Sequence, residues 1–128
     1  MIIKYLDNII NNNKIFEIYK FPNDKFSNID DEVYIGEKNN DKKEGKGILL
    51  FLKKNEKRKK YEGNFKNDKK EGKGIFYWND GDRYEGDWKD DKFEGKGIYY
   101  WNDGNIYEGD FKDDKREGKG IFYYKNGF

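Results

Sequence analysis

The chain has 128 residues, of which 34% are hydrophobic, 41% charged and 19% aromatic, and its net charge is +1. This near balance of 27 basic and 26 acidic residues gives no global field that would select nucleic acid, so we expect no nucleic-acid partner. Cys, His and Thr are absent and Ser27 is the only serine, which excludes disulfides and removes most nucleophiles, zinc ligands and general bases. We therefore expect a protein that is not an enzyme and that binds no cofactor and no metal.

Residues 1–33 differ in composition from the rest of the chain, because all 15 glycines lie in residues 34–128. The first 14 residues hold no apolar run long enough for a signal peptide or a membrane span, so we expect a cytoplasmic protein. Repeat arrays need atypical terminal units to cover the exposed end of the stack. We interpret residues 1–33 as an amino-terminal cap, with a flexible tail as the alternative.

From Tyr34 onward the sequence repeats itself. The same pattern opens at Tyr61, Tyr84 and Tyr107, and these three starts are spaced evenly along the chain. A looser copy opens at Tyr34 and carries an insertion in its second half. Self-similarity at a fixed period indicates a repeat array, with repeats at 34–60, 61–83, 84–106 and 107–128.

Each repeat contains two segments with the pattern of a β-strand. In the third repeat, residues 84–88 (YEGDW) alternate between apolar and polar side chains, which predicts a half-buried strand. A polar segment and the motif Glu-Gly-Lys-Gly follow, and then residues 98–101 (IYYW) form a strand that is apolar on both faces. The turn signal at 102–104 (NDG) ends the repeat. We therefore predict an all-β fold, a single-layer, elongated and twisted sheet of consecutive antiparallel β-hairpins.

Stacked in register, the hairpins bring equivalent residues into ladders of aromatic and aliphatic side chains. Four tyrosines form one ladder and four residues of the second strand form another, and cross-strand aromatic pairs contribute about 0.2–1 kcal/mol each. The two ladders are Tyr34, Tyr61, Tyr84 and Tyr107, and Leu49, Phe76, Tyr99 and Phe122. We expect such ladders to hold a sheet together that has too few aliphatic residues for a thick core.

The recurring pattern Tyr-x-Gly, Gly-x-Gly and Asp-Gly resembles the MORN (membrane occupation and recognition nexus) repeat. The second repeat carries it at Tyr61, Gly63, Gly72, Gly74 and Gly81. The third and fourth repeats match at the same positions, whereas the first has Lys38 in place of the aromatic residue and lacks the Asn-Asp-Gly turn. The resemblance covers about three quarters of the chain and implies a non-enzymatic module of scaffolds, cytoskeletal assemblies or membrane-junction proteins. It also implies a curved face lined by aromatic rings.

The aromatic residues supply the candidate binding site. A single-layer sheet has no second layer to cover its rings, and exposed Trp and Tyr are enriched at binding hot spots. The favoured hypothesis is a scaffold or adaptor that binds an extended peptide or a helix of a protein partner, whereas the alternative is that the rings only pack on neighbouring hairpins. The predicted groove consists of Tyr77, Trp78, Trp88, Tyr99, Tyr100, Trp101, Tyr123 and Tyr124.

A cluster of basic residues in the first repeat supports a second function. Six basic residues between positions 53 and 60 are opposed only by Glu56, and such clusters bind anionic lipids. The alternative hypotheses are a peripheral membrane protein that binds phospholipids and a solvated loop with no partner. The cluster consists of Lys53, Lys54, Lys57, Arg58, Lys59 and Lys60.

The last repeat predicts self-association. An unprotected sheet edge is a template for pairing with another chain, so we expect a homodimer or end-to-end association through residues 107–128, with Tyr124 and Phe128 in the contact.

The Asp-rich turns, such as Asp90 and Asp91, lack the spacing of an EF-hand and recur with the repeat. We interpret them as turn residues and not as a calcium site.

Overall fold

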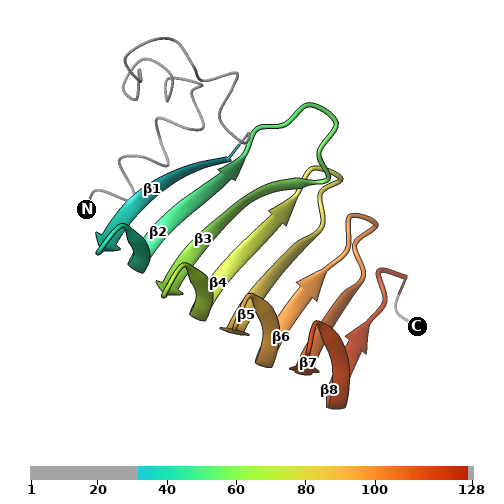
Figure 1. Cartoon of the computed structure of the whole chain (residues 1–128). Helices are drawn as coiled ribbons and strands as arrows, with labels where there is room; N and C mark the ends of the chain where they lie inside the picture. Colours follow the sequence, from blue (N-terminus) through green and yellow to red (C-terminus); the bar gives the residue numbers. More distant parts are fainter. Residues whose placement is uncertain (1–31, 127–128) are drawn as a thin grey trace.

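A computed structural model describes residues 32–126 of the chain as one open antiparallel sheet (Figure 1). The eight strands lie side by side in chain order, and no described residue forms a helix. The sheet begins two residues before the predicted boundary at position 34, and the rest of the predicted cap lies outside the described residues. The strands are β1 (Glu32–Asn39), β2 (Lys42–Phe51), β3 (Arg58–Lys66), β4 (Lys69–Trp78), β5 (Arg83–Lys89), β6 (Lys92–Tyr100), β7 (Ile106–Lys112) and β8 (Lys115–Tyr123).

The tight turn of each hairpin lies inside the predicted polar segment, at the Asp-rich positions interpreted above as turn residues. In the β5–β6 hairpin the turn residues Asp90 and Asp91 both have positive φ, 48° and 69°. Asn and Asp tolerate this left-handed conformation, and two such residues in sequence match the twist of the flanking strands. The equivalent pairs are Asn40 and Asp41, Asn67 and Asp68, and Asp113 and Asp114. The all-β, hairpin-by-hairpin prediction is confirmed.

Glycines of all eight strands are paired in one continuous row across the sheet. In the third repeat Gly86 pairs with Gly97, and each also pairs with a glycine of the adjacent repeat. The row runs through Gly36, Gly47, Gly63, Gly74, Gly86, Gly97, Gly109 and Gly120. With no side chains along this line, the backbones are free to approach closely.

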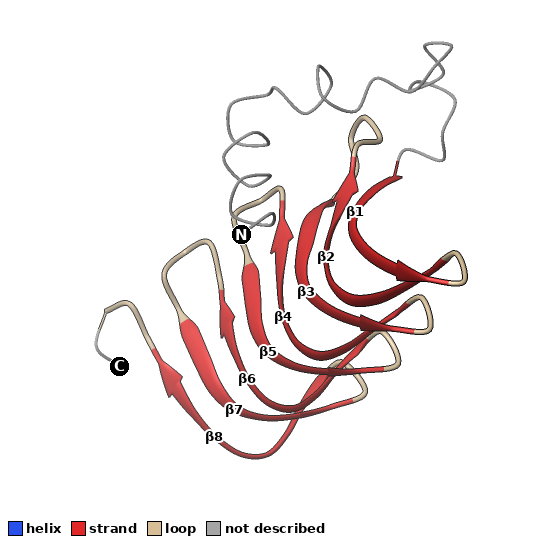
Figure 2. Cartoon of the chain, turned by 90° about the vertical axis from the view of Figure 1, so that its left-hand side faces the viewer, coloured by secondary structure: helices blue, strands red, loops and turns tan. Residues whose placement is uncertain are grey.

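The strands of the sheet are curved along their length (Figure 2). The rings of Tyr61 and Phe65, four residues apart in β3, have centroids 5.0 Å apart. In a straight strand the Cα atoms of such residues are about 13 Å apart. The aromatic side chains therefore lie on the inside of the bend, which we call the inner face, and the opposite side is the outer face.

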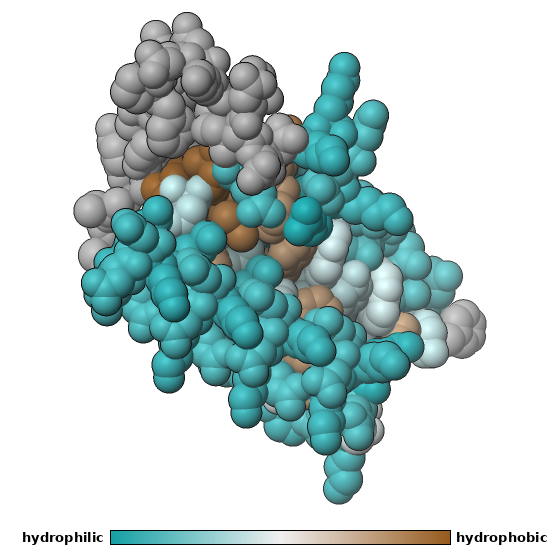
Figure 3. Space-filling model, in the orientation of Figure 1, coloured by the Kyte–Doolittle hydropathy of each residue, from teal (hydrophilic) through white to brown (hydrophobic). Residues whose placement is uncertain are grey.

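The core is a single layer of rings on the inner face. The two predicted ladders form one row there, because antiparallel pairing places Tyr61, Tyr84 and Tyr107 each between two residues of the other ladder. Tyr84 pairs with Phe76 on one side and Tyr99 on the other. Figure 3 shows this face as a hollow in which apolar side chains gather between hydrophilic rims. The buried rings and aliphatic residues of this core are Leu49, Phe51, Tyr61, Phe65, Phe76, Tyr84, Trp88, Phe93, Tyr107 and Phe111.

Candidate functional site: the aromatic inner face

The predicted groove residues divide between the two faces of the sheet, as adjacent residues of a strand must. Trp101 lies on the inner face, where its ring centroid is 4.7 Å from that of Tyr99 and 5.2 Å from that of Phe122. Tyr100 lies on the outer face, where the Arg83 guanidinium is 3.9 Å from its ring centroid. The inner-face members are Trp78, Trp88, Tyr99, Trp101 and Tyr124, and the outer-face members are Tyr77, Tyr100 and Tyr123.

The buried inner rings are structural. Tyr61 and Tyr84 have no exposed surface, and Trp88 is 5% exposed. The Trp88 indole Nε1 donates a hydrogen bond of 3.1 Å to the Gly74 carbonyl oxygen, which satisfies the polar atom of this buried ring. Trp88 is therefore a core residue, and no partner can reach most of its surface.

A strip of rings nearer the long loops remains accessible. Trp78, Tyr99, Trp101 and Phe122 are half-buried against the core, and Tyr124 is 50% exposed. Consecutive members contact each other, from Trp78–Tyr99 at 5.4 Å between centroids to Phe122–Tyr124 at 4.5 Å. We call these five residues the rim strip. No second layer of described residues covers it.

The Tyr99 hydroxyl gives the rim strip one fixed polar group. It donates a hydrogen bond of 3.0 Å to a carboxylate oxygen of Asp82. Burial raises the pKa of Tyr99 well above its ordinary value, and the hydrogen bond to Asp82 raises it further. The ring is therefore neutral at physiological pH, with its orientation set by the loop before β5.

The residue that covers each repeat tyrosine differs along the array. Lys70 and Arg116 lie above the rings of Tyr61 and Tyr107 at 5.7 and 5.6 Å, whereas Phe93 stacks on Tyr84 with centroids 3.9 Å apart. Beside Phe93, the inner face has a pocket of about 330 Å³. The pocket is lined by Phe93, Tyr99, Trp101, Phe111, Asp114, Lys115 and Arg116. It adjoins the rim strip at Tyr99 and Trp101 and can accept a single apolar or aromatic side chain.

The predicted basic loop joins β2 to β3, and two of its six basic residues are already engaged. The Arg58 guanidinium donates hydrogen bonds of 3.0 and 3.1 Å to the two carboxylate oxygens of Glu56, which hold the Glu56 pKa down at about 2. Lys60 is 8% exposed, and its ammonium lies 3.0 Å from Glu62. Lys53, Lys54 and Lys57 are exposed in the loop, and Arg58 and Lys59 are exposed at the start of β3. Within residues 32–126, no helix is long and apolar enough to span a membrane.

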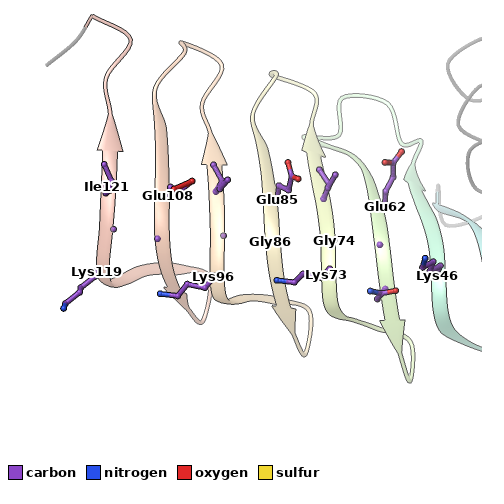
Figure 4. Close-up of a pocket in the computed structure, with 17 residues that line it drawn as sticks. Lys46, Glu62, Lys73, Gly74, Glu85, Gly86, Lys96, Glu108, Lys119 and Ile121 are labelled. Atoms are coloured by element: carbon purple, nitrogen blue, oxygen red, sulfur yellow. The ribbon is translucent and has the colours of Figure 1, made fainter.

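The outer face carries a shallow groove over the glycine row that the sequence interpretation missed (Figure 4). Its volume is about 1020 Å³. Figure 4 shows lysines such as Lys96 on one side of the glycines and Glu85, Glu108 and Ile121 on the other. The signal was present in the repeat, since Ile and Glu recur at paired positions, as Ile98 and Glu108 do. Lys96 and Lys73 are ion-paired with Asp110 and Asp87, so the groove carries little unpaired charge there.

The Asp-rich turns have structural roles. Asp91 accepts a hydrogen bond of 2.8 Å from the Lys70 backbone N–H, and Asp114 accepts one of 2.9 Å from the Phe93 backbone N–H. Each carboxylate thereby ties its turn to the preceding repeat. In the part of the chain that the structure describes, no group of three or more His, Cys, Asp or Glu side chains is placed to hold a metal ion.

The family model of the MORN repeat matches residues 34–52, 61–83, 84–106 and 107–127. These spans cover more than half of the chain and coincide with the four hairpins of the sheet. No curated protein matches the chain. MORN repeats in general are linked to interactions with membrane phospholipids or with proteins. The chain belongs to the MORN repeat family.

Proposed function

We propose that the chain is a non-enzymatic scaffold that binds a segment of a protein partner along the rim strip. The observation that carries this proposal is the continuity of the strip. Its five rings contact one another from β4 to the residue after β8, and they remain half-buried or exposed. Partly exposed aromatic surfaces of this extent are typical of interaction sites.

The chemistry of the strip indicates the kind of segment that fits. Trp78, Tyr99 and Trp101 offer apolar contact along the array, so the partner needs apolar or aromatic side chains spaced along an extended peptide or one face of a helix. The pocket beside Phe93 would take the main anchor. Arg116 and Asp114 at its edge present both signs of charge, which favours an anchor flanked by polar residues over a purely apolar surface.

Paired alanine substitutions test the proposal. Replacing Trp78 and Trp101 removes inner-face rings, whereas replacing Tyr77 and Tyr100 removes the adjacent rings on the outer face. Both double variants lose two aromatic side chains from adjacent positions of the second and third hairpins, so the second controls for general loss of stability. We expect Trp78→Ala/Trp101→Ala to abolish capture of partners from native lysate and Tyr77→Ala/Tyr100→Ala to retain it. Folding is checked by circular dichroism, and equal capture by both folded variants would count against the proposal.

A second candidate function rests on four exposed lysines in and next to the β2–β3 loop. Lys53, Lys54 and Lys57 are exposed on the loop and Lys59 at the start of β3, and each basic residue near an anionic membrane contributes about 1 kcal/mol. We propose as the alternative that this loop brings the protein to phospholipid surfaces. Arg58 and Lys60 contribute less, because their charges already face Glu56 and Glu62.

Flotation with vesicles separates the two functions. The test variant Lys53→Glu/Lys54→Glu/Lys57→Glu reverses three exposed charges of the loop. The matched control Lys66→Glu/Lys89→Glu/Lys112→Glu reverses three exposed charges near the tight turns at the opposite end of the hairpins. The lipid hypothesis predicts salt-sensitive flotation with phosphatidylserine vesicles that only the loop variant loses. If both variants float equally, or if high salt has no effect, the loop is not a membrane site.

A further inference from the structure

The two outer edges of the sheet carry complementary halves of the contacts that join one repeat to the next. Three side-chain contacts recur at the junctions between repeats. In the first, present at the last two of the three junctions, an Asp at the fourth position of a repeat accepts a hydrogen bond from a backbone N–H of its own hairpin and pairs with a lysine of the preceding repeat. Asp87 accepts from Lys96 N–H at 3.0 Å and pairs with the Lys73 ammonium. Asp110 accepts from Lys119 N–H and pairs with the Lys96 ammonium in the same way.

The other two recurring contacts join the tight turns. At every junction an Asp of the following turn accepts a hydrogen bond from a backbone N–H of the preceding repeat, at 2.7, 2.8 and 2.9 Å for Asp68, Asp91 and Asp114. A Glu of the preceding repeat in turn accepts from a backbone N–H of the following turn. The distances are 2.8, 3.0 and 3.1 Å for Glu44, Glu71 and Glu94.

Strand β8 carries the groups that a preceding repeat supplies to each junction. Residues 32–126 contain no following repeat that these groups could contact. Lys119 is equivalent to Lys73 and Lys96, and Figure 4 shows all three side chains leaning the same way, with Lys119 directed past β8. The Arg116 backbone N–H and the Glu117 carboxylate are equivalent to the other two preceding-repeat partners. Gly120 is exposed, whereas Gly74 and Gly97 at the same position are buried.

Strand β1 and the turn after it carry the groups that a following repeat supplies to each junction. Glu37 accepts a hydrogen bond of 2.6 Å from the Lys46 backbone N–H with one carboxylate oxygen, as Asp87 does within its own hairpin. No lysine of a preceding strand faces its other oxygen in the described sheet. Asn40 and Asp41 occupy the turn positions of Asp90 and Asp91, with the same left-handed backbone.

We propose that copies of this chain associate head to tail, with β8 of one copy paired to β1 of the next. The register that continues the glycine row places Gly120 opposite Gly36 and Lys119 opposite Glu37. It also brings Arg116 N–H to Asp41 and Glu117 to the Asn40 N–H, so that all three junction contacts are made. Because the two surfaces are different, each added copy leaves one β8 edge and one β1 edge available, and the assembly can grow beyond a dimer. This inference goes beyond partner binding on the rim strip, which it leaves accessible.

Two β8 strands paired about a two-fold axis form the rival arrangement. With Gly120 opposite Gly120, each Lys119 faces Ile121 and meets no carboxylate. That arrangement does not use β1, and it stops at a dimer. The two arrangements therefore differ in stoichiometry and in their dependence on Glu37.

Charge reversal on each edge tests the proposal by sedimentation velocity over a wide range of protein concentration. The wild type is expected to grow in size with concentration and to pass beyond a dimer. Lys119→Glu and Glu37→Lys each place like charges opposite one another and should weaken association at least about tenfold. An equimolar mixture of the two variants should recover it, because each edge then meets an opposite charge. The control Lys112→Glu makes the same charge change at the last residue of β7, next to a tight turn, and should behave as the wild type.

The double variant Glu37→Lys/Lys119→Glu keeps the test decisive if Glu37→Lys alone fails to fold, since it carries the swapped pair and should associate again. Circular dichroism spectra and melting temperatures verify that the other variants are folded. A monomer at all concentrations, a dimer that ignores Glu37→Lys, or a mixture that does not recover association would each overturn the proposal.

Discussion

The ring of Tyr84 lies across Gly97 in the neighbouring strand. Its hydroxyl donates a hydrogen bond of 2.8 Å to the Asp87 carbonyl oxygen. A Cβ atom built on Gly97 would lie 2.4 Å from that hydroxyl oxygen and 2.6 Å from the ring. The same relationship recurs in every hairpin, between Tyr61 and Gly74 and between Tyr107 and Gly120. Tyrosine and glycine are therefore one packing unit, which places a ring on the inside of each bend.

Gly97→Ala should destabilise the sheet strongly, because its new methyl group overlaps the fully buried Tyr84 ring. Overpacking of this kind lowers the free energy of unfolding by about 1–3 kcal/mol. Urea unfolding of the variant and the wild type measures the difference. Gly72→Asn is the matched control. Its φ of +82° strains most side chains, but asparagine tolerates this conformation and the nearest neighbours would be 3.6 Å from a Cβ, so the cost should be about 1 kcal/mol and smaller than that of Gly97→Ala. Equal destabilisation by both substitutions would refute the packing role of Gly97.

The stability of the sheet should fall in alkaline solution. Burial raises the pKa of Tyr34 to about 12 and raises the pKa values of Tyr61, Tyr84 and Tyr99 further. Unfolded tyrosines ionise near pH 10, whereas these four stay protonated in the folded state, so above about pH 10 the unfolded state binds fewer protons. The free energy of unfolding then decreases as pH rises. Urea unfolding at a series of pH values measures this slope.

Tyr84→Phe is the control for the alkaline effect. It removes one raised pKa and also removes the hydrogen bond to Asp87, so it should lower stability at neutral pH by about 1 kcal/mol. The slope above about pH 10 should nevertheless be shallower than in the wild type. An unchanged slope would mean that Tyr84 does not contribute to the alkaline loss of stability.

Asp114 is expected to stabilise the junction between the third and fourth repeats. Its φ is 70°, and its carboxylate accepts the hydrogen bond from the Phe93 backbone N–H. Asp114→Ala loses this bond and strains the backbone, which should cost about 1–2 kcal/mol in thermal or urea unfolding. Asp114→Asn keeps an oxygen acceptor and tolerates the left-handed conformation, so it should remain close to the wild type. Similar losses in both variants would show that the charge, and not the hydrogen bond, stabilises the turn.

Substitutions of Phe93 test how the residue that covers a repeat tyrosine stabilises the sheet. Phe93→Ala removes a ring stacked on Tyr84 and should cost about 3 kcal/mol. Phe93→Lys places at this position the residue found at Lys70, whose ammonium lies above Tyr61. Because a cation over a ring is also attractive, Phe93→Lys should be less destabilising than Phe93→Ala by about 1 kcal/mol. The opposite order of stabilities would contradict this interpretation.

The sequence was sufficient to predict the hairpin array, because the 23-residue spacing of Tyr61, Tyr84 and Tyr107 and the alternation in residues such as 84–88 are local patterns. The register was not predictable in the same way. It depends on the conformation of the tight turn at Asp90 and Asp91, where both residues have positive φ. The sequence indicated turn residues there but not this conformation. Fixing that turn places Tyr99 beside Tyr84 and merges the two ladders into one row.

The sequence indicated which aromatic residues are candidates for the binding site, but not which of them are accessible to a partner. Period-two alternation indicates that Tyr100 and Trp101 lie on opposite faces, but it does not identify the inner face of the bend. Nor does it indicate that Trp88 is buried and Trp101 only half-buried, since this depends on packing against neighbouring repeats. The ion pairs that engage Arg58 and Lys60 likewise depend on the fold of the loop and on the adjacent strand.

Site-specific photo-crosslinking tests the central claim, binding along the rim strip, most directly. A photoreactive phenylalanine analogue replaces Trp101 on the inner face or Tyr100 on the outer face, and the full chain is irradiated in native lysate. The account predicts that the Trp101 position crosslinks to a partner segment and that the adjacent Tyr100 position does not. Crosslinking from Tyr100 alone, or equally from both positions, would contradict it.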